Sequence, residues 1–305
     1  MQNKWSSIYD QEDRLYLDWD IHYQCNFDCS YCFQKFYGNY GKKIDNVPAK
    51  IKYLMSLLKN HKLDFTLGLL GGEPTLHPKE YFQILDYFDS EILTRKPVSE
   101  IYVSTNMSKD VDFYRYHPVY RNVYQWVSIH PEHHLNDIHF FEKLTLLLHA
   151  SPDQFILGPM LYNIDDEVMV FYEKVYQFFL DHKDTHNIIY SPQIIFSNSD
   201  FIENNCLDFD TTNPIFNNSI TEFTLDDENI TLNEFMENPT SFKGASCNYN
   251  YYYISPDLRC TGSCTNTSFN IQENPIKFLY LKPERIVCQS SQCLDYPMML
   301  SDKER

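Results

Sequence analysis

Three cysteines stand close together early in the chain, in the stretch CNFDCSYC: Cys25, Cys29 and Cys32. The C-x3-C-x2-C spacing lets one loop turn all three sulfurs towards a common centre. Three thiolates leave one four-coordinate iron of a cluster open, and a small molecule can bind there, whereas a closed structural zinc site would need a fourth ligand nearby. The next cysteine, Cys206, lies 174 positions further on. A zinc loop completed by a distant residue, or plain buried cysteines, are the alternatives.

A second motif, GGEP, occupies residues 71–74 and follows an apolar run. Glycines allow a backbone to approach a ligand closely, and the carboxylate of Glu73 can accept hydrogen bonds from an ammonium group. A simple turn before the next helix is the alternative for this tetrapeptide.

Polar residues also end the next two predicted strands. Asn106 ends one strand, and Ser128 and His130 end the following one. Parallel barrels carry their chemistry at the carboxyl ends of the strands, so these side chains are candidates for a site. Satisfied turn hydroxyls and amides are the alternative.

The stretch HPEHH, residues 130–134, places three histidines and a glutamate together. It lacks the helical zincin pattern, so the sequence favours a solvated or substrate-facing loop over a zinc site. His130 is the candidate catalytic residue, through substrate contact or proton transfer.

The elements that position these residues alternate between strand and helix up to about residue 200. Predicted strands cover 15–23, 64–72, 100–106, 123–130, 155–163 and 187–196, and predicted helices cover 47–60, 77–90, 135–150 and 167–181. Strands separated by helix-length crossovers imply a parallel sheet of right-handed βαβ units. The length is short for a barrel of about 250 residues. We therefore expect an α/β fold, an incomplete (βα)6 TIM-like barrel.

Three regions follow from the change in composition along the chain. Residues 1–200 form the barrel, 201–243 an acidic, Asn-rich bridging segment with one short helix, and 244–305 a small cysteine-rich extension.

The composition limits the partners. The 305 residues include 25 Lys and Arg against 42 Asp and Glu, a net charge of −17, so a nucleic-acid partner is not expected. No apolar run is long enough to span a membrane, and no signal peptide is recognised, which predicts a cytoplasmic location with reduced thiols.

Five further cysteines occur near the end of the chain. They are Cys247, Cys260, Cys264, Cys288 and Cys293. Their number exceeds what packing requires, and a zinc site with four cysteine ligands is one explanation. The isolated Cys206 is expected to be a buried apolar residue.

The cysteine loop resembles that of the radical S-adenosylmethionine (radical SAM) enzymes, in which an aromatic residue, here Tyr31, precedes the last cysteine. The resemblance implies a 4Fe–4S cluster on the three cysteines, with S-adenosylmethionine on its open iron. It also implies that Gly72 and Glu73 contact the methionine amino group. Ser128 and Asn106 would lie near the ribose or the carboxylate.

The last region resembles the SPASM/twitch extensions of these enzymes, which hold an auxiliary 4Fe–4S cluster. The match is partial, because Leu258 follows Asp257 where the family hairpin has glycine. The resemblance implies Cys247, Cys288 and Cys293 as ligands, with either Cys260 or Cys264 as the fourth.

The resemblance implies reductive cleavage of S-adenosylmethionine and hydrogen abstraction from a substrate C–H bond, with net oxidation or rearrangement. A flavodoxin- or ferredoxin-type reductant would supply the electron. The substrate is a small polar metabolite or a peptide; the 24 residues before Cys25 leave no room there for a leader-binding domain. A non-enzymatic iron–sulfur or zinc protein for electron transfer or sensing is the alternative from another class, and the GGEP motif argues against it.

Overall fold

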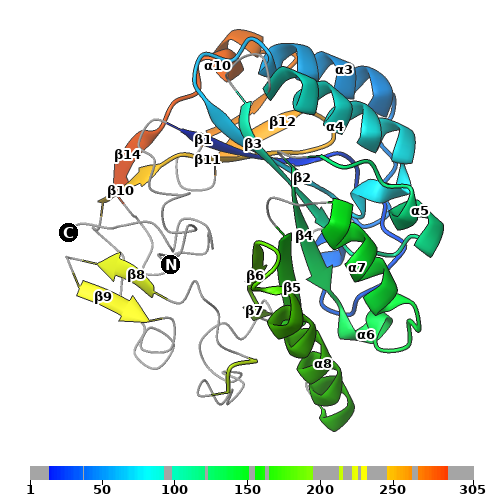
Figure 1. Ribbon diagram of the computed structural model, residues 1–305. Helices are drawn as coiled ribbons and strands as arrows, with labels where there is room; N and C mark the ends of the chain where they lie inside the picture. The colour runs from blue at the N-terminus through cyan, green and yellow to red at the C-terminus, as the bar shows by residue number, and fades with distance from the viewer. Residues whose placement is uncertain are drawn as a thin grey trace.

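The structure is a computed structural model of the chain. It describes residues 14–36, 38–92, 98–120, 123–150, 155–161, 165–194, 213–215, 222–225, 228–231, 246–262 and 267–287. The fold is α/β, built on a ten-stranded, largely parallel sheet (Figure 1). This confirms the predicted fold class.

Six consecutive parallel strands form the main part of the sheet. They are β1 (Leu15–Asp20), β2 (Phe65–Leu70), β3 (Val98–Thr105), β4 (Val123–Ile129), β5 (Phe155–Leu161) and β6 (Ile188–Tyr190), with β7 (Gln193–Ile194) beside β5. Neighbours in sequence are neighbours in the sheet, as βαβ units require. The carboxyl ends of the strands therefore meet at one edge.

Helices on one side of this curved sheet connect the strands (Figure 1). The main ones are α3 (Val47–Leu58), α4 (Pro78–Ile92), α5 (Val111–Arg115), α7 (Phe140–Ala150) and α8 (Asp166–His182). In α3, which lies within the predicted helix 47–60, the buried residues form one apolar face: Ile51, Leu54, Met55 and Leu58. Within the described part of the chain, none of the helices combines the length and apolar composition needed to cross a membrane.

Side chains along β1 alternate between the helix-covered core on one side of the sheet and the inner side of the sheet. Leu15, Leu17 and Trp19 belong to the core shared with α3 and α4. Asp18 and Asp20 point to the opposite, inner side of the sheet, because successive side chains alternate in direction.

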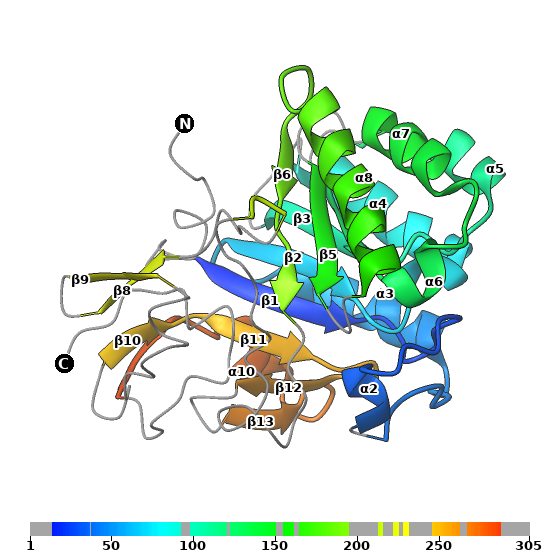
Figure 2. The same cartoon turned by 90° about the horizontal axis from the view of Figure 1, so that it is seen from below.

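The C-terminal region joins the same sheet rather than forming a separate layer. Strand β11 (Tyr251–Ile254) pairs in parallel with β1, and β12 (Arg259–Gly262) and β13 (Thr267–Asn270) continue antiparallel (Figure 2). A short helix, α10 (Pro275–Leu279), follows, and β10 (Ser246–Tyr249) pairs with β14 (Glu284–Val287). The extension thus contributes residues to the inner side of β1.

The bridging segment is described only in part. Its strands β8 (Glu222–Leu225) and β9 (Glu228–Thr231) form an antiparallel hairpin, which its weak periodicity did not predict. The short helix expected elsewhere in 201–243 lies outside the described residues.

The β11–β12 turn keeps a left-handed residue where the family hairpin has glycine. Leu258 has φ +64° and is fully buried in the core. The turn is closed by hydrogen bonds between Ser255 and Arg259, whose main-chain N···O distance is 3.0 Å, and from Leu258 N–H to the Ser255 carbonyl at 2.9 Å. The turn therefore holds a left-handed residue that carries a buried side chain.

Candidate active site

The cysteine loop leaves the carboxyl end of β1. Cys29 is buried, and Cys25 and Cys32 are half-buried. The Cys25 sulfur accepts hydrogen bonds from the main-chain N–H of Phe27 and from Asn106 Nδ2, each at 3.4 Å. Such donors stabilise a thiolate that binds iron. The loop therefore places hydrogen-bond donors at the Cys25 sulfur.

The pKa values of these thiols fit a metal site. Burial raises the pKa of Cys25 to about 11 and that of Cys29 to about 12, and the neighbouring cysteines raise both further. Buried, mutually repelling thiols ionise only when a cation compensates the charge, which metal binding does. The three residues fit the open-position iron–sulfur cluster that the spacing implied.

The two glycines of GGEP bring that turn against the cysteine loop. Gly71 has φ +141°, and a β-carbon on Gly72 would stand 2.0 Å from the Gln24 carbonyl oxygen. Gly72 N–H donates to the His22 carbonyl at 2.9 Å, and Glu73 N–H donates to the Gln24 carbonyl at 2.8 Å. Glycine is required here for close contact between two backbones.

Glu73 is buried between the ends of β2 and β3. Its carboxylate is completely buried, and it accepts hydrogen bonds from Thr75 N–H at 3.0 Å, Thr105 Oγ1 at 2.9 Å and Asn106 N–H at 2.6 Å. Burial raises its pKa, and these donors act in the opposite direction. The carboxylate therefore joins the ends of β2 and β3, and its contact with the methionine amino group stays a prediction.

Asn106 and Ser128, the two other predicted ligand contacts, differ in their surroundings. Asn106 contacts the cysteine loop through the Cys25 sulfur, and its Oδ1 accepts a hydrogen bond from Ser108 N–H at 3.0 Å. Ser128 is buried on the inner side of β4, with its hydroxyl 3.1 Å from that of Ser104. The structure therefore brings Asn106, but not Ser128, into contact with the loop.

His130 also lies against the cysteine loop. Its Nδ1 is 2.8 Å from the Tyr31 hydroxyl and 3.5 Å from the Cys29 sulfur. Burial lowers the pKa of His130 to about 4, so the ring is neutral at physiological pH. His130 therefore contacts the cysteine loop through Tyr31 and Cys29. Its role in substrate contact or proton transfer stays a prediction.

The HPEHH stretch is a short helix, α6 (Pro131–His134), and not the solvated loop that the sequence favoured. Proline at the first helical position explains the difference, since its φ suits a helix start. Buried His134 accepts from His130 N–H at 2.9 Å, and its Nε2 lies 2.7 Å from the Asn106 carbonyl.

Glu132 and His133 hold the cysteine loop from the other side. Glu132 accepts hydrogen bonds from the main-chain N–H of Ser30 at 2.9 Å and from its hydroxyl. The His133 ring stacks on Phe27 at 4.1 Å between centroids. Among the described residues, the ligand atoms of Cys29, Glu132 and His133 lie within 4.8 Å of one another. Sequence reasoning missed this pairing, because the two segments are about a hundred residues apart.

The C-terminal cysteines are described in part. Cys260 is fully buried in the apolar core, paired across the hairpin with Ile254 and across β13 with Phe269. The backbone of Cys247 lies on β10. Cys206, Cys264, Cys288 and Cys293 lie outside the described residues.

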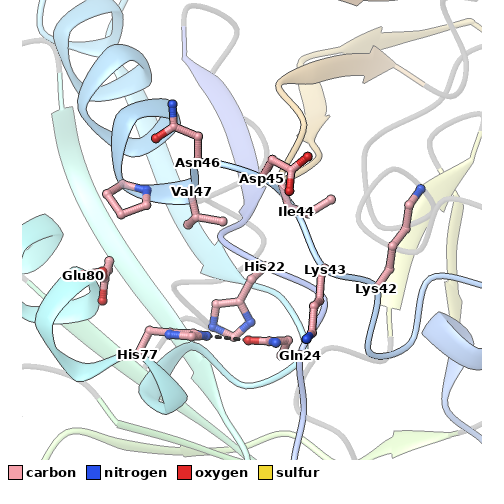
Figure 3. A pocket seen from close by; sticks show the side chains of 11 residues that line it. His22, Gln24, Lys42, Lys43, Ile44, Asp45, Asn46, Val47, His77 and Glu80 are labelled. Carbon is pink, nitrogen blue, oxygen red and sulfur yellow. Dashed lines mark hydrogen bonds between the residues drawn. The ribbon is translucent and has the colours of Figure 1, made fainter.

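A cavity of about 430 Å³ opens beside the GGEP turn, between the starts of α3 and α4 (Figure 3). His22 and His77 meet edge to face in it, and His77 Nε2 lies 2.6 Å from Gln24 Oε1. Burial lowers the pKa of His22 to about 4. Lysines and carboxylates both line the cavity, so its charge favours no class of ligand.

Fold and site together show a parallel α/β sheet with a three-cysteine loop after its first strand, in contact with the turn that follows the second strand. A family model for the radical SAM superfamily matches residues 19–142. The cysteine loop, the GGEP turn and Asn106 all lie within that range. Over these residues the chain is similar to the radical SAM superfamily, a class of enzymes.

Individual relatives are distant. An S-adenosylmethionine-dependent nucleotide dehydratase of Fibrobacter sp. (strain UWH6) is 32% identical over 77 residues, which are 23% of this chain and 22% of that protein. Native anSMEcpe with bound AdoMet is 14% identical, with a TM-score of 0.54 over 88% of this chain and 80% of that one. Its complex with AdoMet and the Cp18Cys peptide is 16% identical, with a TM-score of 0.51 over the same shares. The match thus spans about a fifth of the curated relative, and the solved structures show a shared fold.

Proposed function

We propose that this protein binds a 4Fe–4S cluster through Cys25, Cys29 and Cys32, cleaves S-adenosylmethionine reductively and abstracts a hydrogen atom from a substrate C–H bond. When bound, cluster and cofactor would supply the 5′-deoxyadenosyl radical. The observation that carries the proposal is the contact of the cysteine loop with the GGEP turn and with Asn106, which the close approach at Gly72 and the Asn106–Cys25 hydrogen bond create.

The chain's own residues would orient the cofactor and keep the loop rigid. The Glu73 carboxylate and the main-chain carbonyls of the GGEP turn are the groups that can accept hydrogen bonds from the methionine ammonium. Glu73 would also fix the turn to β3. Ser128, on the inner side of the sheet, would face the ribose or the carboxylate.

A second 4Fe–4S cluster belongs to the proposal. Cys260 lies among apolar side chains in the core, which favours Cys264 as the fourth ligand with Cys247, Cys288 and Cys293. This auxiliary cluster would accept the electron left on the substrate, and a flavodoxin- or ferredoxin-type protein would reduce the first cluster. The acidic chain would act in the cytoplasm, without nucleic acid or membrane.

The substrate class is a small polar metabolite or a peptide. The curated relative is named for a nucleotide and the solved anSMEcpe complex holds a peptide, so the comparisons leave both open. A carrier or sensor of electrons would not need the GGEP turn.

The test is formation of 5′-deoxyadenosine. The purified chain is reconstituted anaerobically with iron and sulfide and given S-adenosylmethionine and dithionite. The proposal predicts 5′-deoxyadenosine from the unaltered chain and none from the variant in which Cys25, Cys29 and Cys32 are alanine. Bound iron without cleavage would favour the electron carrier.

A further inference from the structure

Three histidines lie together where α7 and α8 end. His149 is in the last turn of α7, His182 is the last residue of α8, and His186 lies four residues beyond it. The ring centroids of His149 and His186 are 5.5 Å apart, and those of His182 and His186 are 6.0 Å apart. We call these three residues the histidine cluster.

The topology separates the histidine cluster from the cysteine loop. The cysteine loop follows the carboxyl end of β1, whereas α7 leads back to the amino end of β5 and α8 to the amino end of β6. The two helices lie side by side in Figure 1 and Figure 2. The histidine cluster therefore stands at the opposite edge of the sheet, on elements that the candidate active site does not use.

Two of these histidines have the spacing of a helical metal site. His182 and His186 are four residues apart, and the main-chain N–H of His186 donates to the His182 carbonyl at 2.9 Å, so one helical turn joins them. Side chains at i and i+4 project from the same face of such a turn, and two histidines so placed can bind one zinc ion. His149 of α7 adds a third ring beside His186.

Hydrogen bonds determine which ring nitrogen of these two histidines carries a lone pair. His182 Nδ1 lies 2.8 Å from the Phe178 carbonyl, which can only accept, so Nδ1 carries the proton. Thr185 Oγ1 donates its single proton to the His182 carbonyl at 3.1 Å and therefore accepts from His186 Nδ1 at 3.0 Å. The lone pair of each neutral ring is thus on Nε2. Histidines that bind metals use their other ring nitrogen in this way.

The local electrostatics also favour a cation at the histidine cluster. The carboxyl ends of α7 and α8 carry partial negative charge, and His149 and His182 lie in the last turns of these helices. Burial lowers the pKa of His186, and the neighbouring His149 and His182 lower it further. A ring that resists protonation is more available to a metal ion, because only the neutral ring can bind one.

The ring separations are close to those of imidazoles around one metal ion. With a Zn–N distance of about 2.0–2.1 Å, two imidazoles on a tetrahedral zinc ion have centroids about 5 Å apart. The separations of 5.5 and 6.0 Å are slightly larger. The ligand nitrogens of the three rings do not all lie within 4.8 Å of one another, so binding requires the rings to turn, which the exposed His149 can do.

We propose that the histidine cluster binds a divalent transition-metal ion, zinc in the first place, and so joins the end of α7 to the end of α8. Imidazole is a ligand of zinc, nickel and copper, whereas magnesium prefers oxygen. Three nitrogens leave one position of a tetrahedral zinc ion for water. The inference goes beyond the proposed function, because it requires neither the iron–sulfur cluster nor S-adenosylmethionine.

The test is calorimetric titration of the reconstituted chain with zinc chloride and, separately, with magnesium chloride. Iron content is measured before and after, to show whether zinc has displaced iron from cysteines. We expect zinc to bind at least about tenfold more tightly than magnesium. Equal binding of the two ions would indicate attraction to an acidic chain alone and would overturn the proposal, as would the absence of zinc binding.

Substitutions test the three residues directly. His149→Gln, His182→Gln and His186→Gln each remove one ligand, and His139→Gln, at an exposed position before α7, is the matched control. We expect each of the three to weaken zinc binding about tenfold or more and the control to leave it unchanged. Zinc held by cysteines would not respond to these substitutions. Full zinc binding by His186→Gln, whose ring lies beside both others, would overturn the proposal.

Thermal unfolding of the unaltered chain gives a readout that needs no variant. An ion that binds the folded chain and not the unfolded chain raises the thermal midpoint. Zinc should raise the midpoint of the unaltered chain, magnesium should not, and the increase with zinc should be smaller in His186→Gln. An unchanged midpoint with saturating zinc would contradict the joining of α7 to α8 by the ion.

Discussion

The carboxylate of Glu132 accepts two hydrogen bonds from Ser30, one from its main-chain N–H at 2.9 Å and one from its hydroxyl. Ser30 lies between two of the three loop cysteines, and Glu132 lies on α6, beyond the end of β4. The cysteine loop is therefore fixed by contacts on both sides, from the GGEP turn and from α6.

Glu132→Ala should loosen the loop. A charge-assisted hydrogen bond at an exposed site contributes about 1 kcal/mol, and the variant should bind less iron at the first site and melt at a lower temperature. Iron analysis and thermal unfolding measure this. Glu173→Ala, at an exposed position of α8, is the control. Unchanged iron content in Glu132→Ala would contradict a role for Glu132 in fixing the cysteine loop.

Gly72→Ala should disrupt the site at its centre. The new β-carbon would stand 2.0 Å from the Gln24 carbonyl oxygen and 2.8 Å from the Cys25 nitrogen, and neither backbone can move away cheaply. We expect a loss of about 1–3 kcal/mol in stability and reduced iron binding. Gly41→Asn is the control. A β-carbon at Gly41 would meet no atom within 4 Å apart from its chain neighbours, and asparagine tolerates the φ of +67° at this position. Normal iron binding by Gly72→Ala would contradict the packing.

Asp20 should make stability depend on pH. Its pKa is raised from 3.8 to about 7, so the folded chain binds this proton more tightly than the unfolded chain does. The stabilisation is complete below about pH 4 and is lost as the pH rises through 7. The thermal midpoint of the unaltered chain should fall relative to Asp20→Asn across this window. A constant difference would contradict burial of an uncompensated carboxylate.

Leu258 offers a test of the β11–β12 turn. Its left-handed φ of +64° costs a residue with a β-carbon about 1 kcal/mol, while its buried side chain contributes about 2–5 kcal/mol. Both Leu258→Gly and Leu258→Ala should destabilise the chain. The glycine variant should be the more stable of the two by about 1 kcal/mol, because only glycine relieves the strain. The usual order, with alanine more stable, would contradict the turn geometry.

The cysteines of the C-terminal region should separate by role. Cys260→Ala should keep the iron of both proposed clusters, because Cys260 packs in the core. Cys264→Ala should lose about four irons per chain, those of the auxiliary cluster. Iron and sulfide analysis of both variants decides the matter. Loss of iron in Cys260→Ala, with Cys264→Ala unaffected, would reverse the assignment.

Local patterns predicted the barrel well, because they report which face of an element is buried. The helix α3 and the strand β1 lie within their predicted ranges, and the order of the six parallel strands follows from short right-handed crossovers. The three cysteines and the GGEP turn could be singled out because the residues of each motif lie within a few positions of one another in the sequence.

Contacts between distant segments could not be predicted in this way. Pairing of β11 with β1 joins residues more than two hundred positions apart, and no local pattern specifies it. The hydrogen bond from Ser30 to Glu132 and the one from Asn106 N–H to Glu73 also join residues far apart in the sequence, so no local pattern predicts them. The aspartates of β1 were visible as the polar phase of the strand, but their tyrosine hydrogen-bond donors on β3 and β11 were not.

Electron paramagnetic resonance of the dithionite-reduced, reconstituted chain, before and after addition of S-adenosylmethionine, tests the central claim most directly. We predict that the cofactor changes the signal of the cluster on Cys25, Cys29 and Cys32, and that the change disappears with those cysteines. An unchanged signal, with the fourth iron position held by a protein side chain, would contradict the account.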